Sequence, residues 1–261
     1  MLGFDRQDLP VVWNFLRATV RDKYLGTSLG SIWGIAQPLL MLVTFTFVFG
    51  FVFKTKLPGA DSTLAYATWL IAGYGPWIAI TESTLAAASS VVSASGIVKN
   101  LAIKIELLPI VGVLSGSLPL IVALIFLAIL LVADGNWLTW HAIFVLPIVL
   151  IQIAFILAIG FLVAALSVFF RDLVFALPNL LMVVLFASPI FYPIGSMPAI
   201  MQKLSHFNPF YVICESYRDV LIFHRPPDIL GLAFVIALTA VIGIATLTVF
   251  RRVKGYFEAA L

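Results

Sequence analysis

Glu82 is the one acidic residue that lies well inside an apolar run of this 261-residue chain. A carboxyl group is costly to bury in hydrocarbon, so it must either line a polar cavity or have a structural partner. Thr81, Ser83 and Thr84 lie beside it and could supply hydrogen bonds, which leaves both interpretations open. No row of intramembrane Asp, Glu or His accompanies Glu82, and this argues against a proton-coupled mechanism.

The sequence contains no enzyme signature. It has no nucleophile elbow and no HExxH pair, its three histidines are far apart, and Cys214 is its single cysteine. A phosphate-binding loop of the form GxxxxGK[ST] is also missing, so the chain cannot split ATP by such a loop on its own. We therefore expect no catalytic residue, no metal site and no cofactor bound by this chain.

The composition indicates a membrane protein. Apolar residues make up 62% of the chain and charged residues 10%, against roughly 45–50% and 25% in a soluble domain. The mean hydropathy is +1.14, and one buried core of this length could not hide so much apolar surface. The formal net charge of +3 is too small to indicate a nucleic-acid partner.

Six apolar runs are long enough to cross a bilayer, since a spanning helix needs roughly 20 residues. They cover residues 32–53, 64–88, 107–132, 142–167, 173–192 and 229–250. The expected fold is an all-α polytopic membrane protein, with a cytoplasmic interfacial segment at 1–31 and a six-helix transmembrane domain at 32–261. Lys and Arg are more numerous on the side of the two termini, which predicts that both termini are cytoplasmic.

Two segments on that side have partner-binding features. Before the first run, Leu9, Val12, Trp13, Leu16 and Val20 form an apolar stripe beside polar residues. This predicts an amphipathic helix that lies flat at the membrane surface; packing on the bundle would leave the same pattern. The polar loop at 89–106 is too short for a domain, and it either docks a soluble partner or is a plain tether.

Residues 193–228 are too apolar for a solvated loop and too interrupted by proline for a crossing. From Phe210 to Leu221 the spacing predicts a helix with one apolar face, with Glu215, Arg218 and Asp219 off that face. We interpret the segment as re-entrant helices and a candidate external gate. An interfacial helix that rests on lipid is the alternative.

Aromatic residues are concentrated in the first run. On a helix, Phe45, Phe49 and Phe53 share one side, while Phe47 and Phe51 lie nearly opposite. One set should therefore face protein or a pore, and aromatic rings in a pore suit sugars. The alternative, that these rings face lipid or pack within the bundle, is the more common role of Phe in a spanning helix. Four tryptophans lie near the ends of runs, and an interfacial belt is the better explanation for most of them: Trp69, Trp77, Trp137 and Trp140.

Several short motifs, in this order and spacing around the six runs, resemble the transmembrane permease subunit of type-2-class ATP-binding-cassette exporters of O-antigen, capsule and teichoic acid polymers. The motifs are Arg21-Asp-Lys-Tyr24, Ser28-Leu-Gly30, Trp33, Pro38, Lys99-Asn100, Lys104, Glu106, Pro109, Phe170-Arg171-Asp172-Leu173, Ser188-Pro189, Tyr192-Pro193, Asn208-Pro209-Phe210 and Tyr217-Arg218. One departure is the stretch at 103–108, which is more apolar than the basic, aromatic-rich stretch of the family.

The resemblance implies a homodimer in the bacterial cytoplasmic (inner) membrane, with two copies of a separate ATPase that bind ATP and Mg²⁺. It implies export of a lipid-linked polysaccharide, an undecaprenyl-linked glycan, with O-antigen the first expectation and capsule or teichoic acid the alternatives. An exporter of small molecules in the same class is a nearer competitor than a membrane-embedded glycolipid transferase, because the acidic residues are scattered.

The resemblance also assigns roles to residues. Residues for ATPase coupling are Lys99, Asn100, Lys104, Glu106, Arg171 and Asp172. Residues at the cytoplasmic interface, where a lipid diphosphate or anionic lipid would bind, are Arg17, Arg21, Lys23 and Tyr24. Channel residues are Phe45, Phe49, Phe53 and Glu82, and residues of the periplasmic gate are Tyr192, Pro193, Asn208, Pro209, Phe210, Tyr217 and Arg218.

Overall fold

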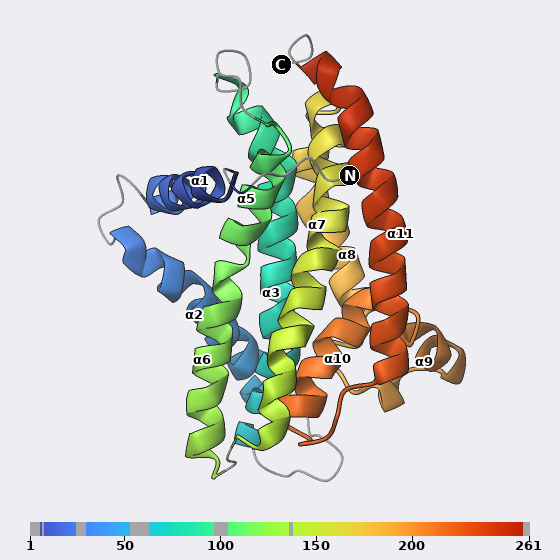
Figure 1. The fold of residues 1–261 in the computed structure, drawn as a ribbon. Helices are drawn as coiled ribbons and strands as arrows, with labels where there is room; N and C mark the ends of the chain where they lie inside the picture. The colour runs from blue at the N-terminus through green and yellow to red at the C-terminus, as the bar shows by residue number, and fades with distance from the viewer. Residues whose placement is uncertain are drawn as a thin grey trace.

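The computed structural model describes residues 6, 8–24, 30–52, 63–96, 104–135 and 138–257. Every regular element in these ranges is a helix, and the long helices run side by side as a bundle (Figure 1). This confirms the all-α class. It is the expected outcome for apolar segments in a bilayer, where each backbone N–H and C=O must be satisfied within its own segment.

The elements follow the predicted runs closely. The helices in the predicted runs are α2 (Trp33–Phe45), α3 (Thr63–Ser93), α5 (Leu107–Gly116), α6 (Leu118–Ala133), α7 (Val145–Phe169), α8 (Leu173–Ala187) and α11 (Ile229–Val253). The helices outside these runs are α1 (Asp8–Tyr24), α9 (Ala199–Ser205) and α10 (Pro209–Leu221). Single turns are η1 (Gly30–Ile32), η2 (Thr46–Val52, a π-helix), η3 (Trp140–Phe144), η4 (Ile194–Ser196) and η5 (Lys254–Tyr256).

Three helical segments in the described part of the chain are long and apolar enough to cross a membrane: Leu107–Ala133, Trp140–Phe169 and Ile229–Tyr256. Two shorter apolar helices, Trp33–Val48 and Leu173–Ala187, correspond to the first and fifth predicted runs. The chain is therefore a multi-pass membrane protein. The count of six crossings stays a prediction.

Helix α3 forms the centre of the bundle and contacts α5, α6, α7, α8 and α10. Small residues allow this close packing, because a methyl group added at Gly116 on α5 would overlap the backbone of Ser83 on α3. At the same crossing, the Ser83 hydroxyl donates to the carbonyl of Val113, 3.0 Å away. Trp69 and Trp77 on α3 are both 3% exposed, so their assignment to an interfacial belt is wrong.

Helix α8 ends at Ala187, five residues before the predicted end of the fifth run. Ser188 is extended, with φ −98° and ψ 138°. The residue before a proline is pushed out of the helical region, and Pro189 itself has no N–H to donate. Residues 188–192 therefore form a turn instead of the last helical turn of a span.

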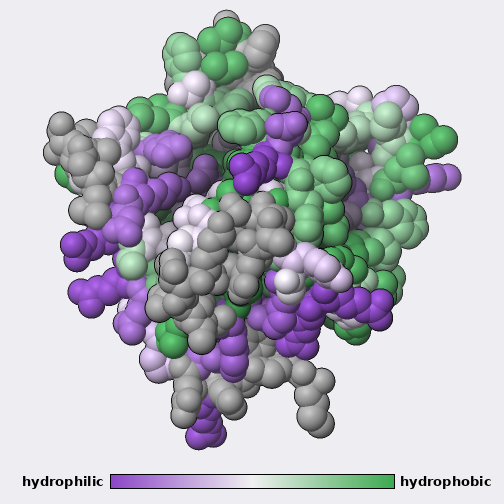
Figure 2. Space-filling view, turned by 90° about the horizontal axis from the view of Figure 1, so that it is seen from above, coloured by the Kyte–Doolittle hydropathy of each residue, from purple (hydrophilic) through white to green (hydrophobic). Residues whose placement is uncertain are grey.

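The two ends of the bundle differ. We call the end that carries α1, the start of α5 and the end of α11 the α1 end, and the opposite one the α10 end (Figure 1). Figure 2 looks down on the α1 end, where hydrophilic side chains are spread among hydrophobic ones. On α1 the apolar residues Leu9 and Trp13 are 70% and 65% exposed, as expected for a helix that rests on a lipid surface.

Candidate functional site

A cavity of about 270 Å³ lies between α2, α3 and α8. Its walls extend from Gly34 to Phe45 on α2, from Glu82 to Tyr74 on α3, and from Pro178 to Phe186 on α8. The cavity therefore extends along all three helices, from the α1 end toward the α10 end. Of these helices, α2 lies in the first predicted run and α8 in the fifth.

An ion pair lies at the α1 end of this cavity. The Lys23 ammonium group, at the end of α1, is 3.1 Å from Oε2 of Glu82 on α3, and both side chains are partly exposed. The structure thus combines the two interpretations of Glu82, since its carboxylate lines a cavity and also has a partner. Thr81, the residue before Glu82, also lines the cavity, and its hydroxyl has no hydrogen-bond partner among the described residues.

Aromatic rings line the other end of the cavity. Phe45 packs edge-on against Tyr74 at 4.7 Å between ring centroids and stacks on Phe191 at 4.8 Å. Phe186 completes the group, 5.7 Å from Phe191. Phe47, in η2, is 58% exposed. The side chain of Phe49 and all of Phe53 lie outside the described residues.

The turn that carries Phe191 is fastened by side chains from two other elements. Tyr66 on α3 donates its hydroxyl hydrogen to the carbonyl of Phe191 at 3.0 Å. The Asn208 amide donates to the Ser188 hydroxyl at 2.7 Å. Asn208 also caps α10, because its side-chain oxygen accepts from the N–H of Phe210 at 3.0 Å.

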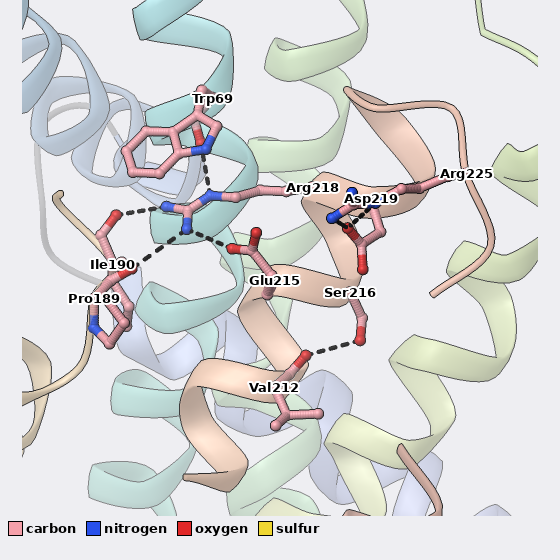
Figure 3. A network of polar contacts seen from close by, with 9 residues as sticks. All are labelled: Trp69, Pro189, Ile190, Val212, Glu215, Ser216, Arg218, Asp219 and Arg225. Carbon is pink, nitrogen blue, oxygen red and sulfur yellow. Dashed lines mark hydrogen bonds and ion pairs between the residues drawn. The ribbon is translucent and has the colours of Figure 1, made fainter. Parts of the chain in front are cut away.

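Arg218 on α10 is completely buried, and its guanidinium lies between Trp69 and the turn of Pro189 and Ile190 (Figure 3). Its guanidinium lies 3.6 Å from the centre of the Trp69 ring and donates to the Trp69 carbonyl at 3.2 Å. It also donates to the carbonyls of Pro189 at 3.4 Å and Ile190 at 2.5 Å, and pairs with the Glu215 carboxylate at 2.9 Å. The guanidinium thus links α10, α3 and the turn after α8.

Arg218 and Asp219 lie off the predicted apolar face of this helix, yet both are buried. α10 contacts α3, α7 and α11, so both faces of the helix are covered by protein. Asp219 is 4% exposed and pairs with Arg225 at 2.6 Å. Two of the three charges that the sequence pattern places away from the apolar face, Arg218 and Asp219, are therefore buried, and each has an opposite charge beside it.

Three of the remaining predicted gate residues belong to α10, and two of them, Phe210 and Tyr217, hold it in the bundle. The Tyr217 hydroxyl donates to Gln152 on α7 at 2.7 Å, and Gln152 donates to the Pro76 carbonyl of α3 at 3.2 Å. Pro209 is in the first turn of α10, and Phe210 packs on Trp77 with 5.6 Å between ring centroids. Beside them, Tyr192 donates to the carbonyl of Phe186 at 2.9 Å, and Pro193 precedes the turn η4.

Two residues assigned to ATPase coupling form ion pairs within the chain. Lys104 lies 2.8 Å from Asp8 on α1. Glu106, at the start of α5, lies 2.7 Å from Lys254 and 3.7 Å from Arg251. Burial alone would raise the pKa of Glu106, but the hydrogen bond from Lys254 and the two positive charges lower this pKa below its usual value.

The other cationic and coupling residues are at the surface or outside the described part. Arg171 and Asp172 are exposed in the tight turn between α7 and α8. Arg17 and Arg21 are exposed on α1. Lys99, Asn100 and the side chain of Tyr24 lie outside the described residues. Within the described ranges, no three His, Cys, Asp or Glu side chains gather closely enough to hold a metal ion.

Sequence reasoning missed three residues of this network: Tyr66, Trp69 and Gln152. Gln152 carried a usable signal, because it is the one amide in the apolar run at 142–167 and a buried amide must find partners. Tyr66 and Trp69 carried none, since a ring near the end of a run is typical of an interfacial position. Their roles depend on contacts with residues more than 100 positions away.

Comparison with known proteins gives a consistent result. The sequence model of the family described as "ABC-2 type transporter" matches residues 11–222. A protein of Myxococcus xanthus named O-antigen export system permease protein RfbA is 26% identical over 250 residues, which are 95% of this chain and 94% of that protein. Two proteins of Klebsiella pneumoniae have the same name. One is 24% identical over 252 residues, which are 93% of this chain and 91% of that protein. The other is 23% identical over 202 residues, which are 77% of this chain and 76% of that protein.

Proposed function

This chain belongs to the ABC-2 type transporter family, and we propose that it is the channel-forming permease subunit of an ATP-driven exporter that moves lipid-linked O-antigen across the bacterial cytoplasmic membrane. The names of the three relatives support the choice of O-antigen, and two of them cover more than nine tenths of both chains. The work of such a subunit is transport and not covalent chemistry.

The observation that carries this proposal is the cavity between α2, α3 and α8. Its α1 end has the Lys23 ammonium group, which is paired with Glu82 in this structure and would exchange that partner for an anionic lipid diphosphate. Its α10 end has the rings of Phe45, Tyr74 and Phe186, on which the C–H faces of sugars pack while their hydroxyls stay hydrated. The polarity of the walls therefore changes along the cavity in the order of the substrate, from diphosphate to glycan.

We propose that two copies of the chain face each other across this cavity. Exposed apolar side chains flank it on both helices, Val43 on α2 and Met182 and Val183 on α8, at 52%, 57% and 68% exposure. A second copy would cover these side chains and turn two half-open cavities into one channel. The homodimer and the six spans, with both termini cytoplasmic, are parts of this proposal.

ATP hydrolysis would come from a separate subunit, because this sequence has no phosphate-binding loop. We propose that two copies of this ATPase, with bound ATP and Mg²⁺, dock at the α1 end on the turn of Arg171 and Asp172, and that they also contact Lys99 and Asn100, which lie outside the described residues. Lys104 and Glu106 would then act from inside the chain, because their ion pairs join the loop after α3 to α1 and to the end of α11. No nucleic-acid partner is part of the proposal.

Deletion of this gene alone tests the function. Surface polysaccharide and lipid-linked polymer on each side of the cytoplasmic membrane should be measured in the same cells. We expect polymer to be lost from the surface and to accumulate on the cytoplasmic side. Unchanged surface polymer would refute export, and failure to make lipid-linked polymer would favour a transferase. Chemical analysis of the trapped polymer separates O-antigen from capsule and teichoic acid.

Complementation with variants tests the site. Lys23→Gln should reduce surface polymer, whereas Lys23→Arg should restore it, because a cation at the mouth is what the diphosphate needs. Lys203→Gln is the matched control, since Lys203 is an exposed lysine on α9 at the opposite end. Stimulation of ATP hydrolysis by small hydrophobic compounds, without loss of polymer export in the deletion strain, would identify a small-molecule exporter instead.

A further inference from the structure

Arg218 has an unusual set of partners for a fully buried cation. A buried charge must be paired and hydrogen-bonded, because water no longer solvates it. One carboxylate, Glu215, lies three residues earlier on the same helix. The other partners are backbone carbonyls of two separate elements, Trp69 on α3 and the pair Pro189–Ile190 after α8. The side chain therefore joins elements that are otherwise apart in the sequence.

The site on α3 has room for this guanidinium because residue 73 is glycine. A methyl group added at Gly73 would overlap the guanidinium of Arg218. Gly73 is one helical turn after Trp69, so the clearance and the Trp69 carbonyl lie on the same side of α3. The ring of Trp69 covers the guanidinium at 3.6 Å, which is a favourable cation–π contact in a desolvated site. Three independent features of α3 thus fit one side chain of α10.

The turn held by Arg218 leads directly to Phe191. This ring is 2% exposed and contacts Phe45, Tyr74 and Phe186, the three rings at the α10 end of the cavity. If the carbonyls of Pro189 and Ile190 leave Arg218, Phe191 must move with them. After the turn moves away, the guanidinium would still form its ion pair with Glu215. The movement therefore leaves no unpaired buried charge.

We propose that Arg218 is a positioning residue that clamps the turn 188–191 to α3 and so keeps Phe191 behind the rings that close the cavity. Release of the clamp opens the α10 end. The inference rests on the proposed function, because it concerns the closed state of the same pathway. It predicts that loss of the clamp opens the pathway in the absence of ATP.

The test measures ATP-independent leak of a small anionic dye from liposomes that contain the purified complex with its ATPase. Arg218→Gln should raise the leak rate about tenfold or more, as expected when hydrogen bonds to a charged group are lost. Arg218→Lys should leak as well, because one ammonium group lacks the planar fork that reaches α3 and the turn together. Lys203→Gln is the matched control, since it removes an equal charge from an exposed position of the same segment 193–228, and it should not leak.

Two further variants keep the test decisive if Arg218→Gln does not fold. Gly73→Ala pushes the guanidinium off α3 without changing charge, and Phe191→Ala removes the ring but leaves the clamp. Both should leak. If a folded Arg218→Gln or Gly73→Ala complex leaks dye no faster than the wild type, the clamp proposal is refuted, even if the wild type exports polymer. If these variants leak but deletion of the gene leaves surface polymer unchanged, the exporter proposal is refuted and the clamp is supported.

Discussion

The carboxylate of Glu106 and the ammonium group of Lys254 lie 2.7 Å apart although 148 residues separate them in the sequence. Through this contact, the start of α5 is fastened to η5, just after the end of α11. Arg251 adds a second positive charge 3.7 Å from the same carboxylate oxygen. Only 8% of the Glu106 side chain is exposed, so its charge depends on these two partners and little on solvent.

Glu106→Gln should destabilise the folded protein by about 1–2 kcal/mol at neutral pH, because hydrogen bonds between charged groups contribute about that much. The pKa of Glu106 is lowered in the folded state, so its stabilisation is present above the usual glutamate pKa and is lost as pH falls through the lowered value. Melting temperatures in detergent, measured from neutral to acid pH, should therefore converge for wild type and variant in the acid range. Asp22→Asn, at an exposed carboxylate on α1, is the control and should have no comparable effect. A difference that persists undiminished in acid would contradict the role of charge.

Gly116→Ala should destabilise the bundle by about 1–3 kcal/mol, the usual cost of overfilling a packed interior. The added methyl group meets the backbone of Ser83, which cannot move aside as a flexible side chain could. Gly243→Ala on α11 is the matched control, because the nearest atom to its new methyl group is the Ala158 Cβ at an ordinary 3.5 Å. Thermal unfolding of the two variants should separate them, and equal melting temperatures would contradict the close α3–α5 crossing.

The positions of the helices were predictable, because apolar run length is set by the thickness of a bilayer and needs no tertiary information. The error at the end of the fifth run has a local cause. Ser188 to Tyr192 continues the apolar run, but Pro189 and Pro193 forbid the last helical turn. Hydropathy measures whether a segment leaves water, and the prolines decide whether it stays helical.

The partners of the charged residues were not predictable. The pattern identified Glu82 as unusual, but Lys23 is 59 residues away and is outside the apolar run. In α10 the pattern correctly separated apolar from charged positions, yet it could not reveal that α3 and α7 cover both sides of this helix. Arg218 therefore had to be located by tertiary contacts, whereas Asn208 before Pro209 already had the sequence of a helix cap.

Tyr217 and Gln152 should be energetically coupled. Tyr217→Phe removes the hydroxyl that donates to Gln152 at 2.7 Å, and leaves a buried amide oxygen without this donor. We expect a loss of about 1–2 kcal/mol for this change. In the background Gln152→Leu, the same change should cost clearly less, because the acceptor is already gone. A double-mutant cycle on thermal stability measures the coupling, and additive losses would show that the hydrogen bond contributes nothing of its own.

Trp13 on α1 should lie in the lipid interface. Its ring is 65% exposed, and the neighbouring Leu9 is 70% exposed, a combination that water disfavours and a membrane surface stabilises. A fluorophore attached at Trp13→Cys should be quenched by bromine-labelled lipids more strongly than one at Asn14→Cys, which lies on the polar side of the same helix. The native Cys214 is fully buried, so it should not compete for the label. Equal quenching at the two positions would mean that α1 packs away from lipid, and the cationic residues Arg17 and Arg21 would then lose their proposed place at the membrane surface.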